Sequence, residues 1–228
     1  MTCSKCKTEN EEIHKYCYQC GISLKEDIID ELLETRLTEE EANHLLRFSY
    51  VFEINNLIDE AIEACTAITE IHPEWADVHF KLGRSYEARG FHGKAIAEYR
   101  KAISINENYI DAHRCLGELY SDEGFYNEAI EQFNIVLNTK IKFDYADIYN
   151  YKGLALEKLG KIDESIEEYK KALEINPDYN EANYNIAKLY QKKKFFDLAF
   201  EHISKAIKGA PRDSRFTKLE EAVKQRLT

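Results

Sequence analysis

Residues 146–179 read ADIYNYKGLALEKLGKIDESIEEYKKALEINPDY and predict two short amphipathic helices joined by a tight turn. Gly153 lets the first helix approach a neighbour closely, and Gly160 ends that helix where a left-handed residue is needed. Pro177 ends the second helix. Small and aromatic residues recur at helical spacing on the inner side of that helix: Ser165, Tyr169 and Ala172. A hairpin of this kind cannot bury its apolar face alone, so it predicts further copies alongside.

Four further copies of this pattern lie in the chain. Their frames begin at residues 42, 76, 110 and 180, and with the copy at 146 the successive spacings are 34, 34, 36 and 34 residues. The close-packing position of Gly153 is occupied in three of the other copies by Gly83, Gly117 and Ala187. The copy at 42 is more degenerate. Five copies in one register predict an array of stacked helical hairpins.

The period and the recurring glycine, tyrosine and alanine positions resemble the tetratricopeptide repeat family over roughly three quarters of the chain. The resemblance implies an all-α fold, a right-handed α-solenoid with about five helix-turn-helix repeats over residues 42–213. Residues 214–228 predict a C-terminal helix that caps the array, with apolar residues on one side: Phe216, Leu219 and Val223. Residues 23–41 predict an acidic, amphipathic connecting helix that packs on the first repeat.

Composition narrows the classes of partner. The chain of 228 residues carries 42 acidic and 31 basic residues, for a formal net charge of −11. This balance argues against a general affinity for nucleic acid or anionic membranes. No apolar run approaches the ~20 residues needed to cross a bilayer, and the first ten residues contain no apolar signal core. We expect a cytoplasmic protein.

Residues 1–22 contain the clearest metal-binding pattern, two CxxC pairs separated by a ten-residue spacer: Cys3, Cys6, Cys17 and Cys20. In each pair the two-residue gap lets both sulfurs point at one centre, which predicts a tetrahedral Zn²⁺ site with Zn–S distances of ~2.3 Å. The pattern resembles the short zinc-ribbon family, including the trailing Gly21. Four protein ligands leave no open position for water, so the predicted zinc is structural.

Two alternatives concern this N-terminal module. Two disulfides are the competing interpretation of the cysteines, but they are disfavoured in a cytoplasmic chain. His14 can replace one cysteine as a ligand, although the four cysteines already have suitable spacing. The basic residues of the module are matched by glutamates, so we favour a protein contact over a nucleic-acid contact for the ribbon.

The family resemblance also implies a concave groove lined by the first helix of each repeat. Its fifth and ninth positions are occupied, in chain order, by Leu46, Tyr50, Phe80, Arg84, Arg114, Glu118, Asn150, Leu154, Tyr184 and Lys188. Aromatic residues supply contact area, Asn150 can hold a peptide backbone, and the cations can bind carboxylates. The alternative is an ordinary solvated face. The two-carboxylate clamp of co-chaperones is not matched by the residues at the corresponding places: Phe80, Arg84, Cys115, Asp147 and Tyr151.

Other polar positions have structural explanations. His79 and His113 share one repeat position, but no third ligand recurs there, so we expect packing rather than metal binding. An acidic residue recurs in the first turn of four first helices: Asp77, Asp111, Asp147 and Glu181. Interaction with the helix N-terminus explains these carboxylates, while recognition of a basic ligand stays as the alternative.

The sequence therefore predicts a non-enzymatic scaffold or adaptor that binds a peptide or helix of a partner protein in the groove and carries structural Zn²⁺ as its only cofactor. The alternative is a nucleic-acid-associated regulator whose ribbon contacts DNA, RNA or the transcription machinery. The chain has no Gly-rich phosphate loop and no nucleophile–base pairing that would indicate an enzyme. Homo-oligomerisation through the ends of the array stays open.

Overall fold

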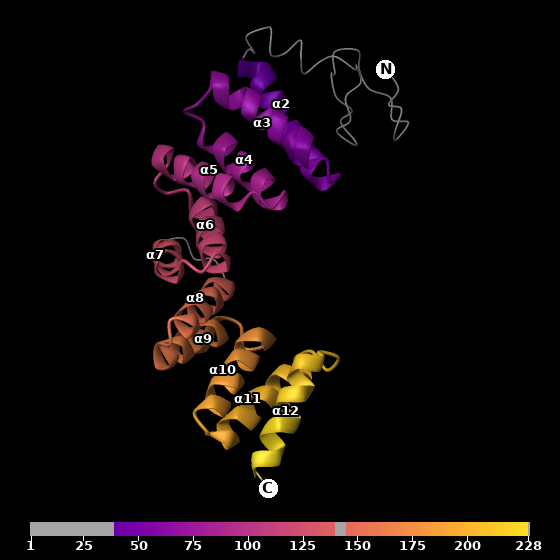
Figure 1. The fold of residues 1–228 in the computed structure, drawn as a ribbon, viewed down its shortest axis with the longest axis vertical. Coiled ribbons are helices and arrows are strands. Elements are labelled where there is room, and N and C mark those ends of the chain that lie inside the picture. Colours follow the sequence, from indigo (N-terminus) through magenta and orange to yellow (C-terminus); the bar gives the residue numbers. More distant parts are fainter. Residues whose placement is uncertain (1–38, 140–144, 228) are drawn as a thin grey trace. The chain divides into compact units, whose positions relative to one another are not determined.

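A computed structural model describes residues 39–139 and 145–227, which form α-helices and no strand (Figure 1). In chain order the helices are α2 (Glu39–Ile54), α3 (Ile58–Ile71), α4 (Ala76–Ala88), α5 (His92–Ile105), α6 (Ile110–Asp122), α7 (Tyr126–Leu137), α8 (Ala146–Lys158), α9 (Ile162–Ile175), α10 (Asn180–Lys192), α11 (Phe196–Gly209) and α12 (Ser214–Leu227). The predicted zinc ribbon and residues 23–38 of the predicted connecting helix lie outside the described residues.

The helices follow the predicted repeat frame. Four first helices, α4, α6, α8 and α10, begin at residues 76, 110, 146 and 180, where the sequence places the repeats. In the copy at 42 the first helix begins earlier, at Glu39. Each of the pairs α2–α3, α4–α5, α8–α9 and α10–α11 packs together as a hairpin, and α12 packs on α11. The prediction of an all-helical array of hairpins is confirmed.

The chain divides into two compact units between residues 112 and 113. The described core of the first unit joins α2, α3 and α4 and includes Phe52, Cys65 and Ile68. In the second unit one core cluster centres on Tyr169 and Ile186, and another on Ile203 and Phe216. No helix among the described residues is long and apolar enough to cross a membrane.

The distance between the two helices of a hairpin is set by a glycine on one helix and an aromatic ring on the other. A Cβ atom placed on Gly153 would lie 2.7 Å from the Tyr169 ring, and one on Gly83 would lie 2.7 Å from Tyr99. Because no side chain tolerates that separation, glycine is required wherever the second helix carries a large ring. The last repeat has Ala187 in the register of these glycines, and Ile203 in the register of Tyr99 and Tyr169. Isoleucine is smaller than tyrosine, and Ile203 belongs to the same core cluster as Ala187.

The turn between the two helices of a hairpin needs a left-handed backbone. Gly160 has φ +78°, which glycine adopts without steric cost. The corresponding turn of the last repeat contains Lys194 with φ 64° instead. A side chain in this conformation costs roughly 1–2 kcal/mol, so the last repeat carries local strain that the copy at 146 avoids.

Candidate functional site

In the first unit, the predicted groove residues differ in how far they reach solvent. The side chains of Tyr50, 48% exposed, and Arg84 lie at the surface, whereas Leu46 is half-buried against the core. Phe80 is only 8% exposed. Its ring packs against Tyr99 and Tyr109, with centroid distances of 5.8 and 5.0 Å. Phe80 therefore supports the surface from beneath and offers little area to a ligand.

A buried lysine lies between α2 and α4, close to the exposed Tyr50. The side chain of Lys81 is 1% exposed, and its Nζ lies 3.0 Å from Glu53 Oε2 and 3.1 Å from the centroid of the Tyr50 ring. Ser85 donates a hydrogen bond to the other carboxylate oxygen of Glu53 at 3.2 Å. Burial lowers the pKa of Lys81, and the Glu53 carboxylate opposes that shift. The ion pair and the Tyr50 ring together hold the ammonium group in place.

Charged groups of α2 and α4 act together on the Tyr50 phenol. Burial raises its pKa most, the carboxylates of Asp77 and Glu53 raise it further, and the Arg84 guanidinium opposes them. The contacts of Lys81 with the Tyr50 ring and with Glu53 join α2 to α4, and Arg84 follows Lys81 by one helical turn. We call this set the Tyr50 patch: Tyr50, Glu53, Asp77, Lys81 and Arg84. Within it, Lys81 is neutralised by Glu53, while Arg84 lies exposed at the rim.

In the second unit, the predicted groove residues mostly contact one another or their neighbours. Arg114 Nη1 lies 3.0 Å from Glu118 Oε1, one helical turn away. Asn150 is buried, and its Oδ1 accepts a hydrogen bond from Asn185 at 3.2 Å. Leu154 is half-buried. The amide of Asn150 therefore ties α8 to α10, so that oxygen is already occupied.

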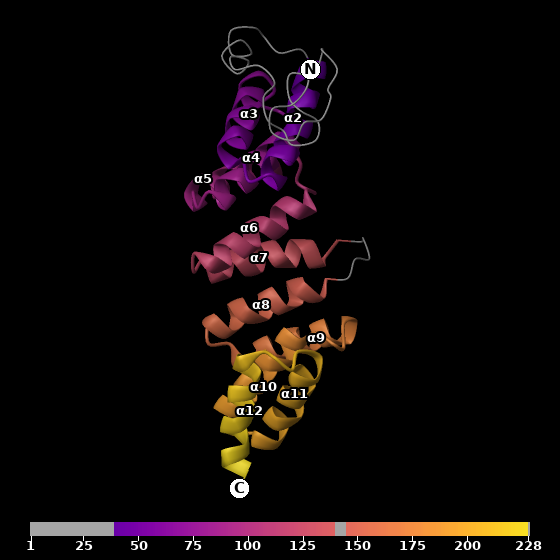
Figure 2. The ribbon, with the colours of Figure 1, turned by 90° about the vertical axis from the view of Figure 1, so that its right-hand side faces the viewer.

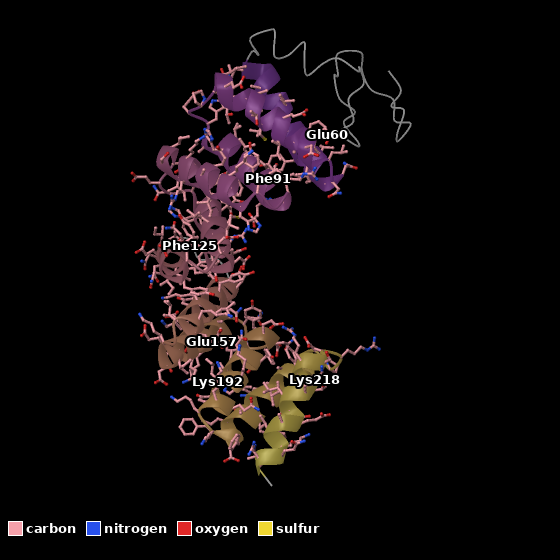
Figure 3. All side chains as sticks on the ribbon, in the orientation of Figure 1. Glu60, Phe91, Phe125, Glu157, Lys192 and Lys218 are labelled. Carbon is pink, nitrogen blue, oxygen red and sulfur yellow. The ribbon has the colours of Figure 1, made fainter. Side chains whose placement is uncertain are left out.

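The cationic end of this predicted surface is also paired. Lys188 and Lys192 lie 3.1 and 3.5 Å from the Glu157 carboxylate, which is 8% exposed. Glu157 and Lys192 are labelled in Figure 3. Lys188 therefore joins α10 to α8 through an ion pair. A carboxylate ligand at Lys188 has to compete with Glu157 for the same ammonium group.

The C-terminal helix covers the last predicted aromatic residue. The ring of Tyr184 stacks on Phe216 of α12 with a centroid distance of 5.0 Å. The Arg215 guanidinium lies 5.4 Å from the Tyr184 centroid and forms an ion pair with Glu181. Phe216 and Arg215 thus contact the Tyr184 ring, which the sequence had assigned to partner binding. Helix α12 of the same chain packs on this part of the last repeat.

The other polar positions join the two helices of a hairpin. His79 Nδ1 lies 2.6 Å from Glu98 Oε2, and His113 Nδ1 lies 2.7 Å from Gln132 Oε1. Among residues 39–139 and 145–227, no group of three or more His, Cys, Asp or Glu side chains has the arrangement of a metal site. Of the recurring acidic residues, Asp147 accepts the backbone N–H of Ile148 at 2.8 Å, in the first turn of α8.

Sequence reasoning missed Lys81 and Glu53, which complete the Tyr50 patch. Both lie outside the fifth and ninth repeat positions. One signal was available: a lysine stands at the sixth position of the copy at 76, where the later copies have Cys115, Tyr151 and Asn185. Its burial depends on Glu53, which is 28 residues away in the chain.

Comparison with known proteins agrees with the fold. A family model described as TPR repeat matches residues 84–124 and 155–194. The first stretch contains α5 and α6, and the second contains α9 and α10. The chain contains tetratricopeptide repeats. No curated protein sequence matches it.

Solved structures with the same architecture cover most of this chain. PilF of Pseudomonas aeruginosa is 17% identical, with a TM-score of 0.72 over 87% of this chain and 86% of that one. YrrB, described as a TPR protein with an unusual peptide-binding site, is 18% identical, with a TM-score of 0.71 over 85% and 97%. MamA of Desulfovibrio magneticus RS-1 is 17% identical, with a TM-score of 0.70 over 76% and 97%. At these identities the similarity establishes the fold alone.

Proposed function

We propose that this chain is a non-enzymatic adaptor that binds a peptide or helix of a partner protein on the first helices of its repeats. The Tyr50 patch is the observation that carries the proposal. It presents a half-exposed aromatic ring in contact with Lys81 of α4, and the exposed Arg84 follows one helical turn later; aromatic residues and arginine are typical of residues that dominate protein interfaces. Because Lys81 is neutralised by Glu53, Arg84 is the cation offered to a ligand. The partner segment is expected to carry a carboxylate beside an apolar side chain.

Site-specific crosslinking tests this surface against a matched position. Tyr50 and Phe91 are both 48% exposed, but Phe91 lies on the turn between α4 and α5 (Figure 3). A photoreactive phenylalanine analogue at position 50 is expected to capture a partner that the same analogue at position 91 does not. Equal capture at both positions, or capture only at 91, contradicts the proposal.

The captured segment is then titrated against purified variants. Arg84→Glu is expected to weaken binding at least about tenfold, because a charge-assisted hydrogen bond becomes a repulsion. Arg89→Glu is the control and is expected to bind normally; Arg89 is an exposed arginine at the C-cap of the same helix and pairs with Asp59. Unchanged affinity of Arg84→Glu assigns the interaction to another surface.

We also propose that the N-terminal cysteines hold one structural Zn²⁺ in a cytoplasmic protein. The support is their sequence spacing, because Cys3, Cys6, Cys17 and Cys20 lie outside the described residues. Elemental analysis of the purified chain is expected to find one zinc per molecule, and Cys17→Ser/Cys20→Ser is expected to lose it. Two disulfides would instead give no zinc and no reactive thiols at these positions.

A further inference from the structure

A groove crosses the second unit between α7 and α9, with α8 at its floor; these three helices follow one another in the ribbon (Figures 1 and 2). Its cavity has a volume of about 480 Å³. Pockets for small ligands and single side chains commonly measure ~300–1,000 Å³. Ile130 and Leu156 contribute apolar surface, and charged side chains make up much of the remaining lining. The groove lies mainly on second helices, so it is separate from the first-helix surface proposed above.

The floor of this groove contains a lysine where three of the other repeats have an aliphatic core residue. Lys152 precedes the close-packing glycine Gly153, and the residues in the same register are buried: Leu82, Leu116 and Ile186. The Lys152 side chain is 17% exposed, and its Nζ lies 3.2 Å from Glu168 Oε1. The copy at 146 thus has a charged pair where its neighbours have apolar packing.

Glu168 of this pair has unused hydrogen-bonding capacity. The residue is 8% exposed and lines the groove. Its Oε1 forms ion pairs with Lys152 and with Lys171, the latter at 3.0 Å. Its buried Oε2 has no hydrogen-bond partner. A buried carboxylate oxygen without a donor is costly, which indicates a missing partner.

The equivalent position in the copy at 76 shows what is missing. There Glu98 Oε2 pairs with His79 at 2.6 Å, and Oε1 accepts a hydrogen bond from Lys101 at 2.8 Å. In the copy at 146, Tyr149 replaces the histidine, and no donor reaches Glu168 Oε2. The replacement leaves this carboxylate oxygen, on the lining of the groove, without a donor from the chain.

We propose that the groove binds an arginine side chain of a partner protein, whose guanidinium donates to the Glu168 carboxylate. Four glutamates and two lysines line the groove, so its charge favours a cation. Each of the two lysines has an acidic neighbour, Lys152 with Glu168 at 3.2 Å and Lys161 with Glu164 at 3.8 Å. A guanidinium suits this place better than an ammonium because it is weakly hydrated, delocalises its charge and has a stem that packs on apolar residues.

Nuclear magnetic resonance titration of the full chain tests this proposal with N-acetyl-arginine methylamide as the probe. N-acetyl-citrulline methylamide, which has the same shape without the charge, is the matched control compound. The arginine probe is expected to shift amide signals of α7, α8 and α9 saturably, with a dissociation constant in the millimolar range, as expected for ~16 non-hydrogen atoms held by few contacts. The citrulline probe is expected to bind at least about tenfold more weakly.

Two variants and a control connect binding to Glu168. Glu168→Gln removes the charge and is expected to weaken arginine binding about tenfold. Tyr149→His is expected to weaken it as well, by supplying the donor that His79 provides to Glu98. Glu174→Gln makes the same charge change on the exposed side of α9, outside the groove lining, and is expected to bind normally.

The proposal is overturned by any of three results: no saturable shift in this groove, equal binding of the two probes, or full binding by both Glu168→Gln and Tyr149→His. Circular dichroism of each variant establishes that the helices are intact. Because the titration uses neither Tyr50 nor Arg84, its outcome is independent of the crosslinking experiment.

Discussion

The hairpins at residues 76–109 and 146–179 share a frame and differ in their polar contacts. Both place a glycine of the first helix against a tyrosine ring of the second, Gly83 on Tyr99 and Gly153 on Tyr169. In the first hairpin, the buried glutamate of α5 pairs with His79 and Lys101. In the second, the equivalent glutamate of α9 pairs only with lysines and keeps one oxygen unpaired.

The difference shows which contacts determine the fold and which leave room for function. The glycine–ring contact fixes the separation of two helices, so any repeat that loses it has to repack. The polar pair on the same hairpin tolerates His–Glu, His–Gln and Asn–His combinations at similar distances, from 2.6 to 2.9 Å. A repeat can therefore change its polar pair, and expose a binding group, without losing its architecture.

The glycine–ring contact gives the largest predicted effect. Gly153→Val is expected to lower the free energy of unfolding by about 3 kcal/mol, because a branched side chain meets the Tyr169 ring at less than its contact distance. Gly83→Val is expected to cost as much against Tyr99. Urea unfolding of each variant measures the loss.

Gly93 provides the control for these substitutions. It is the second residue of α5 and has no heavy atom within 4 Å of a built Cβ, so Gly93→Ala is expected to raise the free energy of unfolding by at most about 0.5–1 kcal/mol, the helix-propensity difference of a helix interior. If the valine variants unfold at the urea midpoint of the parent chain, the spacing of the helices does not depend on the glycine–ring contact.

Substitution of the two buried glutamates is expected to have smaller effects on the free energy of unfolding, and these effects differ between the two hairpins. Glu98→Gln is expected to cost about 2 kcal/mol, because one carboxylate oxygen loses its contact with His79 and the other its ion pair with Lys101. Glu168→Gln is expected to cost about 1 kcal/mol, since only one oxygen is paired. Chemical unfolding compares the two variants side by side. Equal losses would show that the unpaired oxygen of Glu168 has no energetic consequence.

The hairpin turns extend the comparison to the last repeat. Lys194→Gly is expected to raise the free energy of unfolding by about 0.5–1 kcal/mol, because glycine adopts φ 64° without steric cost but loses more conformational entropy on folding. Gly160→Lys is expected to lower it by a similar amount at φ +78°. Thermal unfolding of the reciprocal pair checks both signs. A loss in Lys194→Gly would mean that the lysine side chain makes a stabilising contact.

The histidine of the last repeat gives the smallest effect, a pH dependence. Burial, and to a lesser degree Lys205, lowers the pKa of His202 in the folded chain below its ordinary value of 6.5. The unfolded chain therefore binds the proton more readily than the folded chain. The contribution of His202 to the free energy of unfolding is fully present above pH 6.5 and is lost as the pH falls from 6.5 through the lower pKa of the folded chain. Urea midpoints across this window are expected to depend less on pH in His202→Gln. An unchanged dependence would exclude His202 as its source.

The sequence by itself determined the helical hairpins of this protein. The 34-residue period and the glycine–ring positions place helix starts at residues 76, 110, 146 and 180, where the structure has them. Gly160 also adopts the left-handed turn expected from its position. These features are predictable because helical periodicity, turn chemistry and packing within a hairpin depend on residues close together in the chain.

Only the tertiary structure decided which first-helix side chains are available to a partner. Phe80 and Asn150 are buried, Tyr184 is covered by Phe216, and the Lys81–Glu53 pair appears beside Tyr50. These outcomes depend on neighbouring repeats: Lys81 and Glu53 are 28 residues apart, and Asn150 and Asn185 are 35 apart. A repeat pattern specifies the position of each side chain on its own helix, whereas exposure and charge pairing depend on the residues that the adjacent repeat brings against it.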